Sequence, residues 1–148
     1  MTTAPIEILL VEDNPDDEEL TLLTLQENQL VKQVYVVRDG VEALEYLFAE
    51  GRYANRVPRT APRLMLLDLK LPRLNGLQVL ERVKADPYLR TMPVVVLTSS
   101  CEDRDVARCY QLGANSYIVK PVEFDAFKAA IRQLGQYWRL LNEFPSSA

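Results

Sequence analysis

Five short runs of apolar residues are spaced along this chain, and they constrain its fold more than any other feature. Each run is about four residues long, and none shows the apolar–polar alternation of a strand with one exposed face. Continuous apolar runs of this kind are typical of strands that are buried on both faces of a parallel sheet. The runs cover residues 8–11, 34–37, 64–67, 94–97 and 117–119.

Segments with helical spacing follow these runs, so that strand and helix patterns alternate five times. Asn14 can cap the first helix and Pro15 suits its first position, and the acidic residues that follow favour its positive end. Leu20, Leu23 and Leu30 would continue the apolar side of this helix. The other helical segments cover about residues 41–48, 77–86, 102–113 and 123–141. This alternation predicts an α/β fold, in which helices cover both faces of an open parallel sheet.

The composition narrows the class of protein. Hydrophobic residues make up 48% of the 148 residues and charged residues 26%, which indicates one globular domain and excludes disorder over the whole length. A net charge of −4 argues against binding to nucleic acid or to anionic membranes. The chain has no His, which excludes His-based metal sites, general bases and catalytic triads. With two Cys, no signal peptide and no apolar run of about 18 residues, we expect a cytoplasmic protein without a membrane span.

Polar residues follow four of the predicted strands directly. Glu12 and Asp13 come after the first run, Asp68 after the third, Thr98 after the fourth and Lys120 after the fifth. In open parallel sheets the ligand site lies beyond the carboxyl ends of the strands. We therefore expect these side chains to converge at one edge of the sheet.

This set of side chains suits phosphoryl chemistry. Neighbouring carboxylates repel one another unless a cation is present, and Mg²⁺ prefers hard oxygen ligands of this kind. A lysine and a metal ion can neutralise an incoming phosphoryl group, and a hydroxyl can donate to one of its oxygens. A carboxylate beside them can act as the nucleophile and form an acyl phosphate, a transfer that needs no His in this chain.

The motifs around these residues resemble those of the receiver domains of two-component response regulators, the CheY-like family. They are Val11-Glu12-Asp13-Asn14, Leu67-Asp68-Leu69-Lys70-Leu71-Pro72 followed by Asn75-Gly76, Leu97-Thr98-Ser99, and Val119-Lys120-Pro121. The resemblance covers residues 6–141 and implies a single receiver domain over residues 1–148 with short tails. It implies a flavodoxin-like (βα)5 doubly wound sandwich with strand order 2-1-3-4-5. The segment 51–62, the start of the first helix and the aromatic pair Tyr137-Trp138 are similar to single-domain regulators associated with bacterial phytochromes.

The resemblance also assigns roles to single residues. It implies that Asp68 accepts a phosphoryl group from a histidine kinase, with a bacterial phytochrome as the candidate kinase, and that Thr98 and Lys120 contact that group. Mg²⁺ would be held by Glu12, Asp13, Asp68 and the backbone carbonyl of Lys70. Two further expectations are a cis peptide between Lys120 and Pro121, and an aromatic switch at Tyr117 that acts with Thr98. Such a protein is not an enzyme; it assists its own phosphorylation and dephosphorylation.

Two positions extend these expectations. Lys70, two residues after the acceptor, departs from the pattern of the family. A cation there could pair with the phosphoryl group or with Glu12. We therefore expect the lifetime of the phosphoryl group to be altered, without a prediction of whether it is longer or shorter. The readout surface would be the fourth helix, fifth strand and fifth helix, through which we expect a homodimer. Signalling would then use protein contacts and no DNA-binding output domain. The expected interface residues are Tyr110, Tyr117, Phe127, Tyr137 and Trp138.

Three other functions compete with this interpretation. A flavin-binding electron carrier of the same fold needs a phosphate-binding loop after the first strand, where Glu12 and Asp13 would repel phosphate. A phosphohydrolase with an Asp nucleophile commonly has a second Asp two residues later, where this chain has Lys70. The third alternative is a receiver-like binding module that acts without phosphorylation, against which the full set of acids, Thr98 and Lys120 argues.

Overall fold

The computed structural model describes residues 7–27, 33–56, 62–120, 125 and 129. Five strands form one parallel sheet in the order β2-β1-β3-β4-β5, which confirms the predicted α/β class and strand order. The strands are β1 (Glu7–Val11), β2 (Gln33–Val37), β3 (Leu64–Leu67), β4 (Val94–Thr98) and β5 (Ser116–Val119). In register, Val11 at the end of β1 lies opposite Val37 of β2 and Leu67 of β3, so these three strands end at one level.

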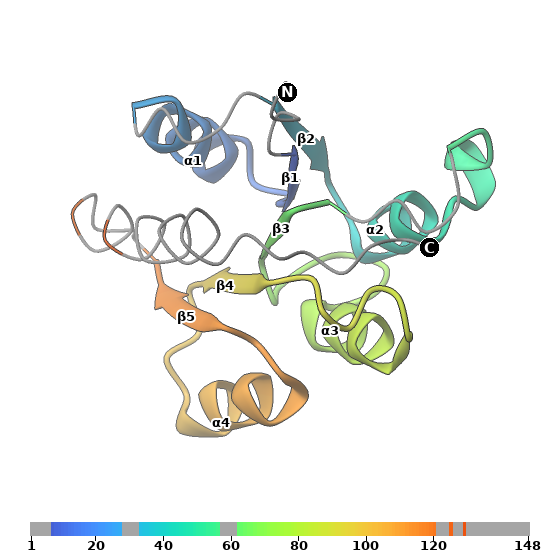
Figure 1. Ribbon diagram of the computed structural model, residues 1–148. Coiled ribbons are helices and arrows are strands. Elements are labelled where there is room, and N and C mark those ends of the chain that lie inside the picture. The colour runs from blue at the N-terminus through green and yellow to red at the C-terminus, as the bar shows by residue number, and fades with distance from the viewer. Residues whose placement is uncertain (1–6, 28–32, 57–61, 121–124, 126–128, 130–148) are drawn as a thin grey trace, which may run out of the picture.

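Helices cover both faces of this sheet (Figure 1). They are α1 (Pro15–Glu27), α2 (Gly40–Phe48), the 3-10 helix η1 (Gly51–Tyr53), α3 (Gly76–Ala85) and α4 (Asp103–Leu112). One apolar cluster joins Leu25 of α1 to Ile8 and Leu10 of β1, and the other joins residues of α2, α3 and α4 to Leu9 and Val11. Thus α1 lies on one face, and α2, α3 and α4 lie on the other. The segment 123–141, predicted to be helical, lies outside the described residues except for Asp125 and Ala129, which are helical.

The central strands explain why their sequences do not alternate. All four residues of β3, from Leu64 to Leu67, have no exposed surface, and the residues of β4 are equally buried. Because both faces of the sheet are covered, every position of a central strand contacts apolar neighbours. Within the described ranges, no helix is long and apolar enough to cross a membrane.

Polar caps set where the helices begin. The Asn14 side chain accepts hydrogen bonds from the backbone N–H groups of Asp16 (2.9 Å) and Asp17 (3.1 Å), so it caps α1 as predicted. Asp39 caps α2 in the same way, and Asn75 forms a reciprocal capping box with Gln78 at the start of α3. The caps at Asn14 and Asp39 start α1 and α2 within four residues of the strands that precede them, whereas a loop of eight residues separates β3 from α3.

The predicted apolar side of α1 is wrong. Leu20 and Leu23 are 47% and 50% exposed, and the buried residues of this helix are Thr21, Thr24 and Leu25. The Thr24 hydroxyl donates to the Leu20 carbonyl at 2.9 Å, which satisfies it inside the protein. A threonine that bonds to its own helix can therefore occupy the core side, and a pattern of leucines alone gives the wrong helical face. Leu30 lies outside the described residues.

Candidate functional site

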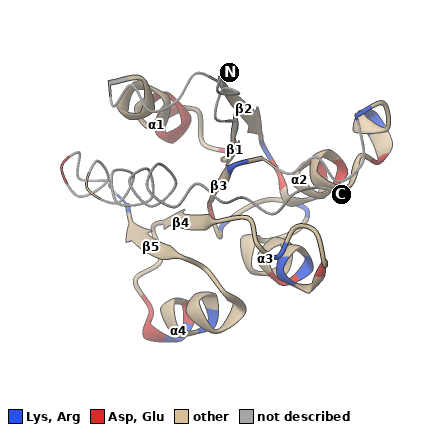
Figure 2. Cartoon of the chain, viewed as in Figure 1, with Lys and Arg blue, Asp and Glu red and all other residues tan. Residues whose placement is uncertain are grey.

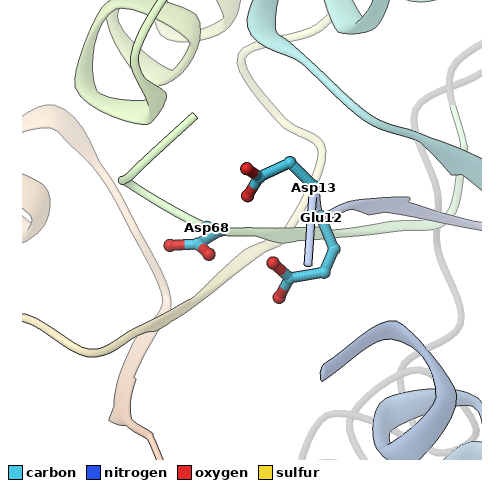
Figure 3. A group of neighbouring side chains, drawn as sticks. All are labelled: Glu12, Asp13 and Asp68. Carbon is cyan, nitrogen blue, oxygen red and sulfur yellow. The ribbon is translucent and has the colours of Figure 1, made fainter. Parts of the chain in front are cut away.

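Three carboxylates meet beyond the ends of β1 and β3, as predicted. Glu12 and Asp13 directly follow β1, and Asp68 directly follows β3. The Asp68 N–H continues the sheet by donating to the Val11 carbonyl at 3.1 Å. One carboxylate oxygen from each of the three residues lies within 4.8 Å of the others. Figure 3 shows the three side chains gathered near one another. Asp13 is exposed, whereas Glu12 and Asp68 are buried.

Lys120 joins this group from the end of β5. Its backbone N–H donates to the Thr98 carbonyl at 2.8 Å, and its side chain reaches past β4 to the carboxylates. The Nζ atom donates to Glu12 Oε1 at 2.5 Å, to Asp68 Oδ2 at 2.9 Å and to Asp17 Oδ2 at 2.9 Å. A protonated lysine has three N–H donors, so all of them are engaged.

The buried charges shift the pKa of both partners. Burial raises the pKa of Glu12 to about 7, and the nearby charge of Asp68 adds to this, while the hydrogen bond from Lys120 opposes it. Burial by itself would lower the pKa of Lys120, but its bonds to Glu12, Asp17 and Asp68 outweigh that effect and raise the pKa above its usual range. Lys120 is therefore a permanent cation in this site at neutral pH.

The donor set fits a small divalent cation. Glu12, Asp13 and Asp68 offer hard oxygen ligands, and one lysine is too little positive charge for the carboxylates gathered there. Acidic residues in the first turn of α1 add to the negative charge at this edge of the sheet (Figure 2). A bound cation would relieve the repulsion between the carboxylates.

The loop after Asp68 holds its carboxylate in place. The Lys70 N–H donates to Asp68 Oδ1 at 3.0 Å, which orients the carboxylate and leaves the Lys70 side chain exposed. The predicted alternative of a Lys70–Glu12 ion pair is not what the structure contains, because Glu12 pairs with Lys120. The loop returns tightly to α3: a Cβ added at Gly76 would lie 2.2 Å from the Asp68 carbonyl oxygen, so the position requires glycine.

Thr98 at the end of β4 and Tyr117 on β5 both bond to Ser100, in the loop between β4 and α4. Thr98 is fully buried, and its Oγ1 accepts a hydrogen bond from the Ser100 N–H at 3.4 Å. The half-buried Tyr117 donates from its hydroxyl to the Ser100 carbonyl at 2.9 Å. The Ser100 hydroxyl in turn donates to Asp105 Oδ2 at 2.5 Å, on the first turn of α4. Ser100 thus links Thr98, Tyr117 and α4.

Sequence reasoning did not place Asp17 and Asp105 at the site. The sequence predicts for Asp17 only a favourable charge at the start of α1, yet its side chain contacts Lys120. The cap at Asn14 was the available signal, because it places residue 17 in the first turn of a helix that starts at the site. The bond between Ser100 and Asp105 depends on the path of a loop and has no comparable signal in the sequence.

Some predicted residues are not tested by this geometry. Pro121, Phe127, Tyr137 and Trp138 lie outside the described residues, so the cis peptide and most of the interface stay predictions. Tyr110 is 50% exposed on α4.

Known proteins share this arrangement of strands and acids. The family model described as the response regulator receiver domain matches residues 8–132, so the chain belongs to the response regulator receiver family. Members of this family are the phosphoryl-accepting components of two-component systems, and the prediction of a receiver domain is confirmed.

Three relatives are response regulators, and the names of two of them refer to phytochromes. The structure of the bacteriophytochrome response regulator AtBRR is 54% identical, with a TM-score of 0.79, and the match covers 95% of this chain and 100% of that one. The phosphorylated cyanobacterial phytochrome response regulator RcpA is 38% identical, with a TM-score of 0.79, over 97% of this chain and 100% of that one. Response regulator Rcp1 from Synechocystis is 37% identical over 90% of this chain and 89% of its own length. A structure of Rcp1 is described as its Mn²⁺-bound form.

Proposed function

We propose that Asp68 is the phosphoacceptor and that Glu12, Asp13, Asp68 and the backbone carbonyl of Lys70 hold Mg²⁺ beside it. The observation that carries this proposal is the environment of one carboxylate. Asp68 Oδ2 is bonded to Lys120, Oδ1 is bonded to the Lys70 N–H, and two further acids lie within 4.8 Å. A buried carboxylate beside two others destabilises the fold unless a cation is bound. A purely structural role for these three residues therefore does not account for the cluster.

The transfer step uses the carboxylate as a nucleophile. An Asp68 oxygen attacks the phosphorus of a phosphohistidine in the kinase, a P–O bond forms, and the P–N bond breaks with its electrons going to the imidazole. Mg²⁺ would neutralise charge on the phosphoryl oxygens. Lys120 supplies a second positive charge, and the buried Thr98 hydroxyl, which accepts from Ser100, retains its own O–H to donate.

The protein assists its own phosphorylation and is not a turnover enzyme. Hydrolases of this chemical type commonly have a second Asp, as the acid–base group, two residues after the nucleophile, and that position carries Lys70 in this chain. Lys70 is exposed and belongs to the same loop as the acceptor, so it can set the phosphoryl lifetime.

In this proposal the protein is cytoplasmic, and its kinase partner is a bacterial phytochrome. Support comes from relatives whose names link them to phytochromes, at 54% identity for AtBRR. The net charge of −4 supports signalling through proteins and not through nucleic acid or membrane surfaces.

The output partner in this proposal is a second copy of the chain. Tyr110 on α4 and Val119 on β5 are 50% and 41% exposed, and they belong to the face that the Ser100 loop joins to the phosphorylation site. Sedimentation of phosphorylated and unphosphorylated protein at tens of micromolar tests this face; a monomer in both states would remove the dimer from the proposal.

Intact mass spectrometry tests the phosphoacceptor. The protein is incubated with acetyl phosphate with and without Mg²⁺, alongside Asp68→Asn and the matched variant Asp16→Asn, which removes one carboxylate outside the site. We expect a phosphoryl adduct that needs Mg²⁺, persists in Asp16→Asn and disappears in Asp68→Asn. No adduct in any of these proteins would favour a binding module that acts without phosphorylation.

A further inference from the structure

Lys120 is bonded to one carboxylate that belongs neither to the acceptor nor to the proposed metal ligands. Asp17 lies in the first turn of α1, and its Oδ2 is 2.9 Å from Lys120 Nζ. We propose that Asp17 is a positioning residue that holds Lys120 back from the phosphoryl group and so weakens phosphoryl binding. This inference rests on the proposed function, since it assumes that the phosphoryl group arrives on Asp68.

The number of donors on Lys120 creates the competition. Its three N–H groups are matched by three acceptors, on Glu12, Asp17 and Asp68. A phosphoryl group adds three strong acceptor oxygens and about −1.5 to −2 charges at neutral pH. To bond to those oxygens, Lys120 must release carboxylates that it holds now.

The three carboxylates differ in what their release requires. Asp68 becomes an acyl phosphate and loses its own negative charge in the same step. The Glu12 side chain is 1% exposed and has no access to water that could replace the lysine. The Asp17 side chain is 37% exposed, so water can hydrate it once Lys120 has moved. Asp17 is therefore the carboxylate that keeps its charge, competes with the phosphoryl oxygens and can be released.

The local structure of α1 makes this release favourable. The backbone N–H of Asp17 is already bonded to the Asn14 side chain at 3.1 Å, so the turn does not depend on the bond to Lys120. The positive end of the helix stabilises a carboxylate in its first turn. The same contact links α1 to the end of β5 in the unphosphorylated protein, and phosphorylation would break that link.

Binding of beryllofluoride, a phosphoryl analogue that attaches to carboxylates, tests the inference at saturating Mg²⁺. Isothermal titration calorimetry compares wild type with Asp17→Asn, with the matched control Asp16→Asn, and with Asp17→Glu, which restores a carboxylate. Asp16 is the neighbouring exposed residue, and its removal changes the net charge equally. A partly exposed ion pair contributes up to about 1 kcal/mol, so we expect Asp17→Asn to bind about three- to fivefold more tightly. Asp16→Asn and Asp17→Glu should bind as wild type does.

Lys120→Met shows whether the effect passes through the lysine. Introducing Asp17→Asn into Lys120→Met should leave beryllofluoride affinity unchanged, because the group that Asp17 restrains is gone. Should Lys120→Met fail to fold in thermal unfolding, the comparison of Asp17→Asn with Asp17→Glu decides alone.

The possible failures are distinguishable. Equal tightening in Asp17→Asn and Asp16→Asn would show a general charge effect and overturn the inference, as would weaker binding in Asp17→Asn. In both of these cases wild type still binds and the proposed function stands. A wild-type protein that binds no beryllofluoride would overturn the proposed function and, with it, the role of Asp17.

Discussion

Substitution of Gly76 by alanine should damage the metal site more than it damages the fold. Gly76 begins α3, and an added Cβ would lie 2.2 Å from the Asp68 carbonyl oxygen and 2.6 Å from Leu69 Cα. Both distances fall short of the ordinary contact distance of 3.4 Å by about 1 Å, so the loop must move by a similar amount. The clash is with backbone atoms, and rotation of a side chain cannot relieve it.

The free-energy cost follows from two opposing terms. Overpacking of a tight site costs about 1–3 kcal/mol. Alanine in a helix recovers about 0.5–1 kcal/mol relative to glycine. The net loss of between about 0 and 2.5 kcal/mol corresponds to a fall in Tm of up to about 10 °C for a domain of this size. Because the displaced backbone orients Asp68 and carries the Lys70 carbonyl, we expect Mg²⁺ affinity to fall at least about tenfold.

Gly113→Ala is the matched control, measured with the same calorimetric Mg²⁺ titration and thermal unfolding. Gly113 caps α4 at φ 104, so alanine there is strained by about 1–2 kcal/mol. The atoms nearest to its added Cβ belong to the Lys84 side chain, at 3.4 Å or more, which is ordinary van der Waals contact. It should lower Tm to a similar degree and leave Mg²⁺ affinity unchanged. Wild-type affinity in Gly76→Ala, or an equal loss in Gly113→Ala, would refute the reasoning.

Three further predictions concern other parts of the chain. Burial raises the pKa of Cys109 to about 11, so iodoacetamide at pH 8 should label the exposed Cys101 and spare Cys109. The stability that the buried neutral thiol contributes is fully present below pH 9 and is lost as the pH rises through about 11. Denaturant titrations at several pH values can measure this loss. Tyr117→Phe removes the hydrogen bond to the Ser100 carbonyl and should lower the free energy of unfolding by about 0.5–1.5 kcal/mol in urea titration. An unchanged free energy of unfolding would mean that this bond does not stabilise the fold. Lys70→Asn should change the rate of autodephosphorylation measured by intact mass over time, and an unchanged rate would remove Lys70 from the control of phosphoryl lifetime.

Much of the site was predictable because it depends on strand ends. The four apolar residues of β3 end where Asp68 begins, and the register with β1 then places Glu12 and Asp13 beside it. Parallel strands bring the residues at their carboxyl ends to one edge of the sheet, independently of the conformation of the loops that connect them. The same reasoning placed Lys120 at the end of β5.

The contacts that sequence reasoning missed depend on helix rotation and loop paths. The buried side of α1 carries Thr21 and Thr24, so leucine spacing pointed to the wrong face, and the contact between Asp17 and Lys120 could not be read from it. The bond between Ser100 and Asp105 needs the β4–α4 loop to fold back on α4. Short-range patterns carry little information about such turns of the backbone.

The identity of the phosphorylated residue is the most direct test of this account. Wild-type protein phosphorylated with acetyl phosphate and Mg²⁺ is treated with borohydride, which reduces an aspartyl phosphate to homoserine, and its peptides are then sequenced by mass spectrometry. The account predicts homoserine at position 68 alone, with Asp13 and Asp17 unmodified. Homoserine at Asp13 or at another acid, with Asp68 intact, would contradict it.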